Sequence, residues 1–321
     1  MANLFSVKVS VVIPVYNGEN TIVDLVHSIN DELKSKVGDL EFVLVNDASR
    51  DNSHDQILEL REQFPENLIY IQLYRNFGEH NAVMCGLNHV TGDCAVIIDD
   101  DFQNPPHEII NLIKVLLEEK VDVVYSHYSE KKHSVFRNLG SWFNGLVAQV
   151  VINKPKDLYL SSYKVLDKQL IDIITKYNGP FPYIDSLILR STKLISTCLC
   201  EHNERAIGTS NYTLRKLFRL WLNMLVGSSI WLLDFSVVFG LLSVSFLSLL
   251  IPVYFFYFSI PETLSNLLIY LFIAIACIQI FIVAIIGLFL RQLVLSINNE
   301  PQYLIRSIYT PETFTNSKVG D

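Results

Sequence analysis

Two long stretches in the C-terminal third of the chain contain no charged side chain. Residues 235–261 and residues 263–290 include no Asp, Glu, Lys or Arg. Each stretch is longer than the roughly 20 residues with which a helix crosses the hydrocarbon core of a bilayer. A buried helix of a water-soluble domain rarely stays uncharged over this length. The sequence therefore predicts two transmembrane helices, at about 235–258 and 266–290.

The basic residues around these stretches predict their orientation. The short connection, residues 259–265, contains neither Lys nor Arg. Basic residues flank the pair on both sides: Arg215, Lys216 and Arg219 come before it, and Arg291 and Arg306 come after it. Lys and Arg are enriched in the cytoplasmic flanks of membrane spans. We therefore expect both termini in the cytoplasm and the connection on the far side.

The segments that border the two stretches also carry interpretable patterns. Residues 212–227 have apolar side chains at helical spacing beside three of the basic residues. This pattern predicts an amphipathic helix over about 211–229 at the membrane surface, with an ordinary solvent-facing helix as the alternative. Residues 291–321 are then expected to form a cytoplasmic tail. Residues 7–15 lack a cleavage region, so we expect no signal peptide.

The first 130 residues alternate between short apolar runs and helix-length segments. The expected strands are residues 7–13, 41–45, 68–73, 94–98 and 121–125. The expected helices are residues 19–36, 51–64, 78–90 and 105–120. Strands that alternate with helices form βαβ units and a mostly parallel sheet. We therefore expect residues 1–210 to fold as one α/β domain with a Rossmann-like sheet.

Three consecutive carboxylates follow the fourth expected strand, where a parallel sheet forms its ligand crevice. Asp99 and Asp101 are two residues apart, so in an extended backbone their side chains project to the same side, with Gln103 one step further. Two carboxylates and an amide oxygen suit Mg²⁺ or Mn²⁺ rather than zinc. Mg²⁺ commonly completes its shell with substrate phosphates, which indicates a diphosphate ligand. The alternative is a solvated turn before a helix that starts at residues 105–106.

The loop after the first expected strand contains Pro14, Tyr16, Asn17 and Glu19. Loops at this position in a doubly wound sheet face the nucleotide crevice. Tyr16 is suited to stacking on a base, and Asn17 or Glu19 to hydrogen bonding with it. Equally, Asn17 and the glycine after it are typical of a turn, and Glu19 of a first helical turn.

The loops after the second and third expected strands carry further polar candidates. Asp47 is placed to accept a hydrogen bond from a base or ribose, with helix capping nearby as the structural alternative. Arg75 is suited to pairing with phosphate or stacking on a base, and Gly78 lets the backbone turn into the next helix. A solvated turn is the alternative for this third loop.

Composition excludes some classes of function. The formal net charge of −8 gives no electrostatic footprint for nucleic acid. The five cysteines show no zinc-type spacing, which favours small buried side chains in a reducing compartment.

In this order, the motifs resemble glycosyltransferase family 2, and most closely its membrane-anchored branch of polyprenyl-phosphate glycosyltransferases. That branch includes dolichol-phosphate mannose synthase and bacterial undecaprenyl-phosphate glycosyltransferases. The matching segments are residues 11–17, 45–51, 75–78, 99–106 and 205–212. Residues 78–86 are similar to enzymes that move a modified aminoarabinose onto undecaprenyl phosphate. The resemblance implies a GT-A fold, a UDP- or GDP-sugar donor, a polyprenyl phosphate acceptor and a bacterial inner-membrane location.

The resemblance also implies roles for individual residues. The nucleotide would be held by Pro14, Tyr16, Asn17, Glu19, Asp47, Arg75, Gly78 and Asp99. The metal and the diphosphate would be bound by Asp99, Asp101 and Gln103. The acceptor phosphate would be faced by Arg205, Ser210, Tyr212 and Arg215. Asp101, Arg205 and Lys164 are the expected catalytic residues, and relatives suggest a homotetramer.

The chain departs from the family pattern at four places. Asn46 replaces the first of two acids, and Ala48 stands where Gly is common. Asn211 replaces a lysine, and Ser161-Ser162-Tyr163-Lys164 stands where Gly-Asp-Phe-Arg is common. The acid that would act as general base is therefore missing. A base contributes about 10²–10⁴-fold to attack by a hydroxyl, whereas a phosphate monoester is already ionised near neutral pH. The departure fits a lipid phosphate acceptor better than a sugar hydroxyl.

The leading hypothesis is therefore an inverting transferase that moves a sugar from a nucleotide diphosphate to a polyprenyl phosphate at the cytoplasmic membrane face. One alternative is a transferase that acts on a hydroxyl of a lipid-linked glycan. Another is a non-catalytic membrane scaffold with a vestigial nucleotide fold. Asp185 is a remaining candidate base, although helix capping or an ion pair is favoured for it.

Overall fold

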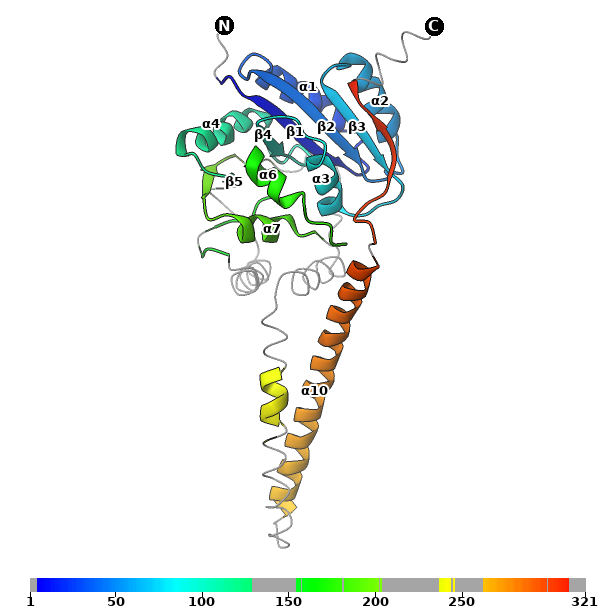
Figure 1. The fold of residues 1–321 in the computed structure, drawn as a ribbon, viewed down its shortest axis with the longest axis vertical. Helices are drawn as coiled ribbons and strands as arrows, with labels where there is room; N and C mark the ends of the chain where they lie inside the picture. The colour runs from blue at the N-terminus through cyan, green and yellow to red at the C-terminus, as the bar shows by residue number, and fades with distance from the viewer. Residues whose placement is uncertain are drawn as a thin grey trace. The chain divides into compact units, whose positions relative to one another are not determined.

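The computed structural model describes residues 5–128, 154–156, 158–180, 182–201, 203, 237–243, 245, 262–298 and 300–311. The chain divides into two compact units. Unit 1 comprises Met1–Arg219 and Pro301–Asp321, and unit 2 comprises Leu220–Glu300. Among the described residues, unit 1 contains an eight-stranded sheet in the order β7-β5-β6-β4-β1-β2-β3-β8 (Figure 1).

The sheet is mostly parallel, as the strand–helix alternation predicts. Its strands are β1 Lys8–Val15, β2 Asp39–Asn46, β3 Leu68–Leu73, β4 Cys94–Ile97, β5 Val123–His127, β6 Lys164–Asp167, β7 Ile195–Leu199 and β8 Ile305–Tyr309. Strand β1 pairs in parallel with both β2 and β4. The pairs β2–β3 and β5–β7 are also parallel. Two strands run antiparallel to their neighbours, β6 against β4 and β5, and β8 against β3. The parallel centre, β4-β1-β2-β3, brings four carboxyl-end loops to one edge.

The expected helices are present with shorter bounds. The helices of unit 1 are α1 Ile22–Leu33, α2 Ser53–Gln63, α3 Glu79–Leu87, the 3₁₀ helix η1 Pro106–Glu108, α4 Ile109–Glu119, α6 Lys168–Ile174 and α7 Ile184–Ser191. Proline at the start of η1 fits its fixed φ angle and its missing N–H. The α/β prediction is therefore confirmed. Residues 131–210 were expected to mix helix and strand without defined bounds, and the structure places β6, β7, α6 and α7 there, whereas β8 was not expected.

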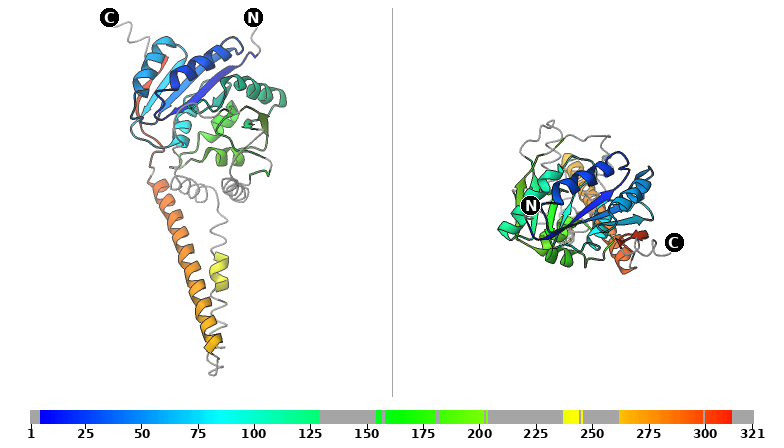
Figure 2. Two further views of the ribbon diagram at one scale, coloured as in Figure 1. Left: turned by 180° about the vertical axis from the view of Figure 1, so that it is seen from behind. Right: turned by 90° about the horizontal axis from the view of Figure 1, so that it is seen from above.

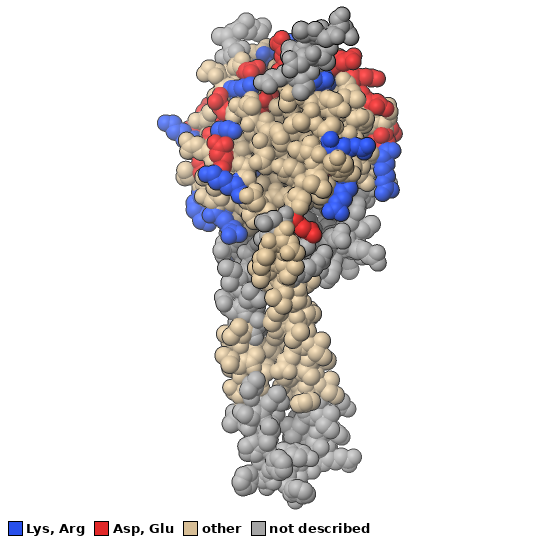
Figure 3. Space-filling model, turned by 45° about the vertical axis from the view of Figure 1, so that its right-hand side comes forward, with Lys and Arg blue, Asp and Glu red and all other residues tan. Residues whose placement is uncertain are grey.

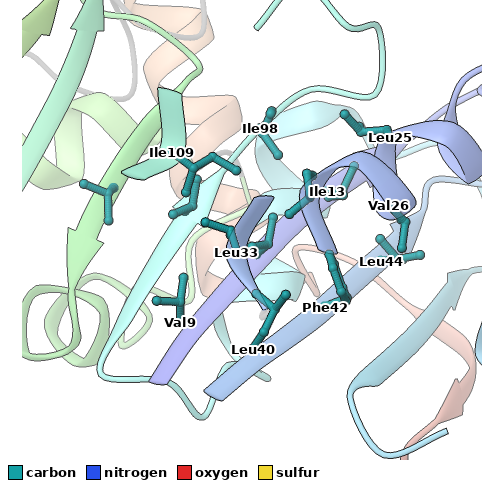
Figure 4. Packing of buried hydrophobic residues seen from close by; sticks show 14 of the residues in the cluster. Val9, Ile13, Leu25, Val26, Leu33, Leu40, Phe42, Leu44, Ile98 and Ile109 are labelled. Carbon is teal, nitrogen blue, oxygen red and sulfur yellow. The ribbon is translucent and has the colours of Figure 1, made fainter. Parts of the chain in front are cut away.

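Alternation along β1 divides its side chains between the two faces of the sheet. Val9, Val11 and Ile13 are fully buried in a cluster that also contains α1 residues such as Leu25 (Figure 4). Each fully buried aliphatic side chain of this kind contributes about 1.5–3 kcal/mol. On the other face, a Cβ at Gly86 of α3 would lie 2.5 Å from a methyl group of Val12. Glycine therefore lets α3 pack closely under the carboxyl ends of the central strands.

The chain returns to the sheet after the apolar stretches. Residues 291–321 were expected to form only a tail, but β8, drawn in red in Figure 2, pairs with β3. In this pairing Tyr70 lies opposite Tyr309. The two rings stack with centroids 5.4 Å apart, and the Tyr74 N–H donates to the Leu304 carbonyl at 3.0 Å. The strand was not foreseen because its partner lies far away in sequence, beyond the reach of local patterns.

Unit 2 contains one candidate membrane span in its described part. Helix α10, Glu262–Ile297, includes Leu271–Leu290, with a mean hydropathy of 2.9 and 6% of the tested window buried. These residues form part of the uncharged surface in Figure 3, where most visible charged side chains belong to unit 1. Of the first expected span, the structure describes helix at residues 237–243 and 245. The expected amphipathic helix at 211–229 lies outside the described residues.

Candidate active site

The loops after β1 and β2 are joined by reciprocal hydrogen bonds. The Asn17 backbone N–H donates to the Ser49 hydroxyl at 3.0 Å, and the Asn17 side-chain oxygen accepts from the Arg50 N–H at 2.9 Å. Asn17 has a φ of 58°, a left-handed conformation that Asn tolerates better than most residues. Asn17 therefore fixes the two loops against each other, a role distinct from the expected contact with a base.

Glu19, two residues after Asn17, also makes a reciprocal pair of hydrogen bonds with the loop after β2. Its N–H donates to the Asp51 carboxylate at 3.0 Å, while its own carboxylate accepts from the Asn52 N–H at 2.9 Å. Between these residues, the Gly18 N–H donates to the Ser53 hydroxyl at 2.9 Å. The polar residues expected to bind a nucleotide thus build a preformed rim from two loops.

Asp47 joins the second loop to the third. Its two carboxylate oxygens accept from the N–H groups of Phe77 and Gly78, at 2.7 and 2.8 Å. Burial raises the pKa of Asp47, and the two backbone hydrogen bonds oppose that rise. Gly78 has a φ of +95°, which a residue with a Cβ rarely adopts, so glycine is required for this turn into α3.

Asn46, where the family pattern has an acid, uses both ends of its amide. Its nitrogen donates to the Tyr70 hydroxyl at 3.2 Å, and its oxygen accepts from the Ser49 N–H at 2.8 Å. The Tyr70 hydroxyl also lies 2.6 Å from Nδ1 of His54. A carboxylate lacks a donor for this arrangement. Asn46 therefore stabilises the loop after β2 from a buried position, with only 1% of the residue exposed.

Three other nucleotide candidates are at least partly exposed on these loops. The Arg75 guanidinium is 4.8 Å from the centre of the Phe77 ring, and Arg75 is exposed. Pro14 lies near the end of β1 and Tyr16 just after it, and both are partly exposed. The structure thus brings together all the loops in which the sequence placed nucleotide-binding residues.

The expected metal ligands lie at the end of β4. The Asp101 carboxylate accepts from the Gln103 N–H at 3.1 Å, and the Asp99 carboxylate accepts from the Ser162 hydroxyl at 2.5 Å. Burial, followed by the charge of Glu79 on α3, raises the pKa of Asp99 to about 7, and Asp101 adds to this rise. Negative charge is therefore concentrated here.

The chemistry of this donor set fits a divalent cation. A cation between Asp99 and Asp101 would offset the repulsion that raises the Asp99 pKa, and Gln103 would add a neutral oxygen. In the described part of the chain, no group of three or more His, Cys, Asp or Glu is arranged to hold a metal ion. Two carboxylates and an amide would leave coordination positions for water and substrate phosphates, as is usual for Mg²⁺.

Lys164 lies in a buried ion pair behind this cluster. It begins β6, opposite Ile97 at the end of β4, and its ammonium group pairs with the Asp185 carboxylate. The Tyr125 hydroxyl also donates to Asp185, at 3.1 Å, and the Lys164 nitrogen lies 4.9 Å from the Tyr125 ring centre. Lys164 and Asp185 are 3% and 7% exposed. The charge of Lys164, an expected catalytic residue, is thus already matched within the protein.

Two aromatic side chains extend this buried group. His80 on α3 packs edge-on against Tyr183, with ring centroids 5.0 Å apart. Burial lowers the pKa of His80 to about 4, so the imidazole is neutral at physiological pH. Sequence reasoning noted His80 only as part of a similar segment, and its packing partner lies more than 100 residues away.

The expected acceptor residues Arg205, Ser210, Tyr212 and Arg215 lie outside the described residues, so their prediction stays untested.

Comparisons with known proteins agree with the fold and the motifs. Residues 10–181 match the family model described as Glycosyl transferase family 2. An undecaprenyl-phosphate 4-deoxy-4-formamido-L-arabinose transferase from Serratia proteamaculans is 33% identical over 218 residues, which cover 68% of this chain and 67% of the relative. The transferase of the same name from Yersinia pestis is 31% identical over 242 residues, covering 71% and 74%.

Solved structures share the fold. A crystal structure of Mycobacterium tuberculosis glucosyl-3-phosphoglycerate synthase aligns with a TM-score of 0.50 and 19% identity, and covers 68% of this chain and 78% of that one. The same enzyme in complex with Mn²⁺, UDP-glucose and phosphoglyceric acid aligns with a TM-score of 0.49. At this level of identity, the likeness concerns the fold alone.

Proposed function

Because the chain belongs to glycosyltransferase family 2, we propose that it transfers a sugar from a nucleotide diphosphate sugar to a polyprenyl phosphate at the membrane. The observation that carries this proposal is the cluster of Asp99, Asp101 and Gln103 at the end of β4, beside loops already joined into a rim. Relatives that are about one-third identical and named as undecaprenyl-phosphate transferases support the acceptor class.

The donor side of the site would hold a Mg²⁺ or Mn²⁺ ion. Asp99, Asp101 and Gln103 are the residues that would bind it. When bound, such an ion acts as a Lewis acid that stabilises the charge of a departing nucleotide diphosphate. Arg75 is exposed beside the same rim and is suited to a phosphate or a base. The donor is a UDP or GDP sugar in this proposal.

The acceptor side requires little proton chemistry. Ser162 occupies the position of the family's acid, and its hydroxyl donates to Asp99. A serine in this arrangement is no base, but a phosphate monoester attacks through an oxygen that is already ionised near neutral pH. The protein then has to align that oxygen with the anomeric carbon. We assign this task to Arg205, Ser210, Tyr212 and Arg215.

We infer that the chain crosses the membrane twice. Strand β8 follows α10 in the chain and pairs with β3, which precedes both apolar stretches. Strands of one sheet lie on one side of a membrane, so the chain between them crosses an even number of times. Helix α10 supplies one crossing, and we place the other at residues 235–258. The flanking basic residues favour the cytoplasm for unit 1 and both termini.

Alkaline phosphatase fusions test this topology, because the enzyme is active only outside the cytoplasm. A fusion after Pro261 is expected to be active, and a fusion after Asp321 inactive. Activity of both fusions would contradict two crossings.

A homotetramer is the proposed assembly, and light scattering of the detergent-purified full chain measures its mass.

The function is tested with the purified full chain and a short-chain polyprenyl phosphate. Radiolabelled UDP- and GDP-sugars are supplied with Mn²⁺ or Mg²⁺, and the lipid is extracted and counted. A 4-formamido-arabinose donor is the first candidate, since the relatives' names include that sugar. We expect labelled lipid that disappears with chelator and in Asp101→Asn. In a parallel reaction with a lipid-linked glycan, label on the glycan without label on polyprenyl phosphate would favour the alternative acceptor. Absence of nucleotide binding in Mn²⁺ would favour a scaffold.

A further inference from the structure

Asp100, the middle carboxylate after β4, has no part in the proposed metal site. Asp100 also has a different hydrogen-bond partner from Asp99. The Asp99 carboxylate accepts from Ser162 in the segment before β6, whereas the Asp100 carboxylate accepts from the backbone N–H of Tyr16 at 3.3 Å. Asp100 therefore links the end of β4 to the loop after β1, on the nucleotide side of the site.

Gly18 gives a second observation of this link. A Cβ at Gly18 would lie 2.5 Å from Oδ2 of Asp100 and 3.2 Å from a methyl group of Val15. The backbone φ of Gly18 is outside the left-handed region, so glycine matters here for space rather than for conformation. A side chain at position 18 would require the Asp100 carboxylate to move away from the loop.

The same loop is fixed from the opposite direction by the loop after β2. Asn17 and Glu19 make their reciprocal hydrogen bonds there, on either side of Gly18. Asp100 thus connects the end of β4 to the loop after β1, which is already hydrogen-bonded to the loop after β2. Tyr16, the aromatic residue suited to stacking on a base, makes the bond to Asp100 through its own N–H and directly precedes Asn17.

We propose that Asp100 is a positioning residue for the donor nucleotide: it fixes the loop that carries Tyr16 and does not bind the metal. This inference rests on the proposed function, because it concerns the nucleotide of the donor. It predicts that changes at Asp100 alter nucleotide affinity, whereas changes at Asp101 alter metal binding and the rate of transfer.

The test compares Asp100→Ala, Asp100→Asn and Asp101→Asn in the full chain. The readouts are KM for the donor, kcat, the Mn²⁺ concentration for half-maximal rate, and binding of UDP and GDP by calorimetry in Mn²⁺. Loss of one hydrogen bond to a charged group weakens binding about tenfold. Asp100→Ala is therefore expected to raise KM and the nucleotide Kd about tenfold, with kcat and the Mn²⁺ requirement near wild type. Asp100→Asn retains an acceptor oxygen and should rescue most of the loss.

Gly18→Ala supplies an independent variant. Because its new methyl group meets the Asp100 carboxylate, we expect a loss of nucleotide affinity like that of Asp100→Ala. In the Asp100→Ala background most of this clash is gone, so the second substitution should add little. Melting temperatures of all variants separate this effect from unfolding.

Two outcomes overturn the proposal: Asp100→Ala that lowers kcat and Mn²⁺ affinity as Asp101→Asn does, or Asp100→Ala with unchanged nucleotide affinity. The calorimetric measurement needs no acceptor. It therefore decides the role of Asp100 even when transfer to a polyprenyl phosphate is absent, which would overturn only the proposed acceptor. A wild-type chain that binds neither UDP nor GDP overturns both.

Discussion

The loops after β1 and β2 differ from the β4–β6 side of the site in how their polar groups are satisfied. In the loops, the side chains of Asn17 and Glu19 are hydrogen-bonded to backbone N–H groups of their neighbours. On the β4–β6 side, Asp99, Asp101 and Glu79 concentrate negative charge around a buried carboxyl group. The polar groups of the first region are satisfied within the protein, whereas the second region would gain stability from a bound cation.

This difference indicates a division of labour. A rim with satisfied hydrogen bonds presents a fixed shape to a nucleotide, so little entropy is lost on binding. A cluster of carboxylates would instead hold the divalent cation that stabilises the negative charge of a departing diphosphate. We therefore expect substitutions in the rim, and of Asp100 that is bonded to it, to change affinity, and substitutions of the β4–β6 residues Asp101 and Lys164 to change rate or stability.

The largest effect is expected for Asp101→Asn. The substitution removes one of the two carboxylates that would hold the divalent ion, and an ion of this kind contributes several kcal/mol to stabilising the transition state. Transfer to polyprenyl phosphate should fall about a thousandfold or more. Asp31→Asn, at an exposed position on α1, is the matched control. Full activity of Asp101→Asn would remove the basis for the metal assignment.

Lys164→Met is expected to act on stability. It leaves the Asp185 carboxylate buried without its cation, and removing one member of a buried ion pair costs about 3–5 kcal/mol. The melting temperature of the purified chain should fall markedly. The double variant Lys164→Met, Asp185→Asn should recover part of the loss, since no uncompensated charge remains. A Lys164→Met protein that is stable but inactive would instead assign the ammonium group directly to catalysis.

His80 predicts a loss of stability on mild acidification. The unfolded chain binds a proton at this residue near pH 6.5, whereas the folded chain does so only near pH 4, because burial lowers the His80 pKa. Stability from this group is therefore complete above pH 6.5 and falls as the pH drops towards 4, by up to about 3 kcal/mol.

His80→Phe is the variant that isolates this contribution. It keeps an aromatic ring against Tyr183 and cannot take up a proton. Melting temperatures between pH 7 and pH 4 should fall less steeply for the variant than for the wild type. Equal slopes would show that another group causes the acid sensitivity.

Asp47→Asn tests the rim. An amide in place of the carboxylate turns one acceptor into a donor, which would face the N–H of Phe77 or Gly78. Leaving one such group unsatisfied costs about 1–3 kcal/mol, so the donor KM should rise about tenfold while kcat changes little. A fall in kcat without a change in KM would place Asp47 on the reacting side of the site.

The sequence located the parallel strands and their loops because periodicity and turn residues are local signals. For example, the apolar run at residues 94–98 predicted β4 to within one residue. Short antiparallel strands such as β6 and β8 lack that signal, since their stability comes from partners far away in the chain.

Within the site, the sequence identified the polar residues, and the structure adds their partners within the protein. Asn17, Glu19 and Asp47 were expected to face a nucleotide, and each is bonded to a neighbouring loop. A carboxylate or amide that follows a strand has the same local pattern whether it meets a ligand or a backbone N–H. The spatial order of the strands, β4-β1-β2-β3, shows which neighbouring loops can supply these N–H groups.

The smallest effect is expected for Ser162→Ala, on the β4–β6 side of the site. Ser162→Ala removes a hydrogen bond to Asp99, but a cation between the carboxylates would satisfy the same oxygen. The rate should therefore fall only a few-fold, in keeping with a single hydrogen bond. A thousandfold fall would show that the acceptor needs Ser162 for its activation.

Ser162→Asp restores the acid of the family pattern and separates the two acceptor chemistries. If the acceptor is a phosphate, a base has no proton to remove, and a third carboxylate beside Asp99 adds repulsion. The rate with polyprenyl phosphate should then fall below that of Ser162→Ala. A rate above wild type would mean that proton removal limits transfer, and the acceptor would have to be a hydroxyl.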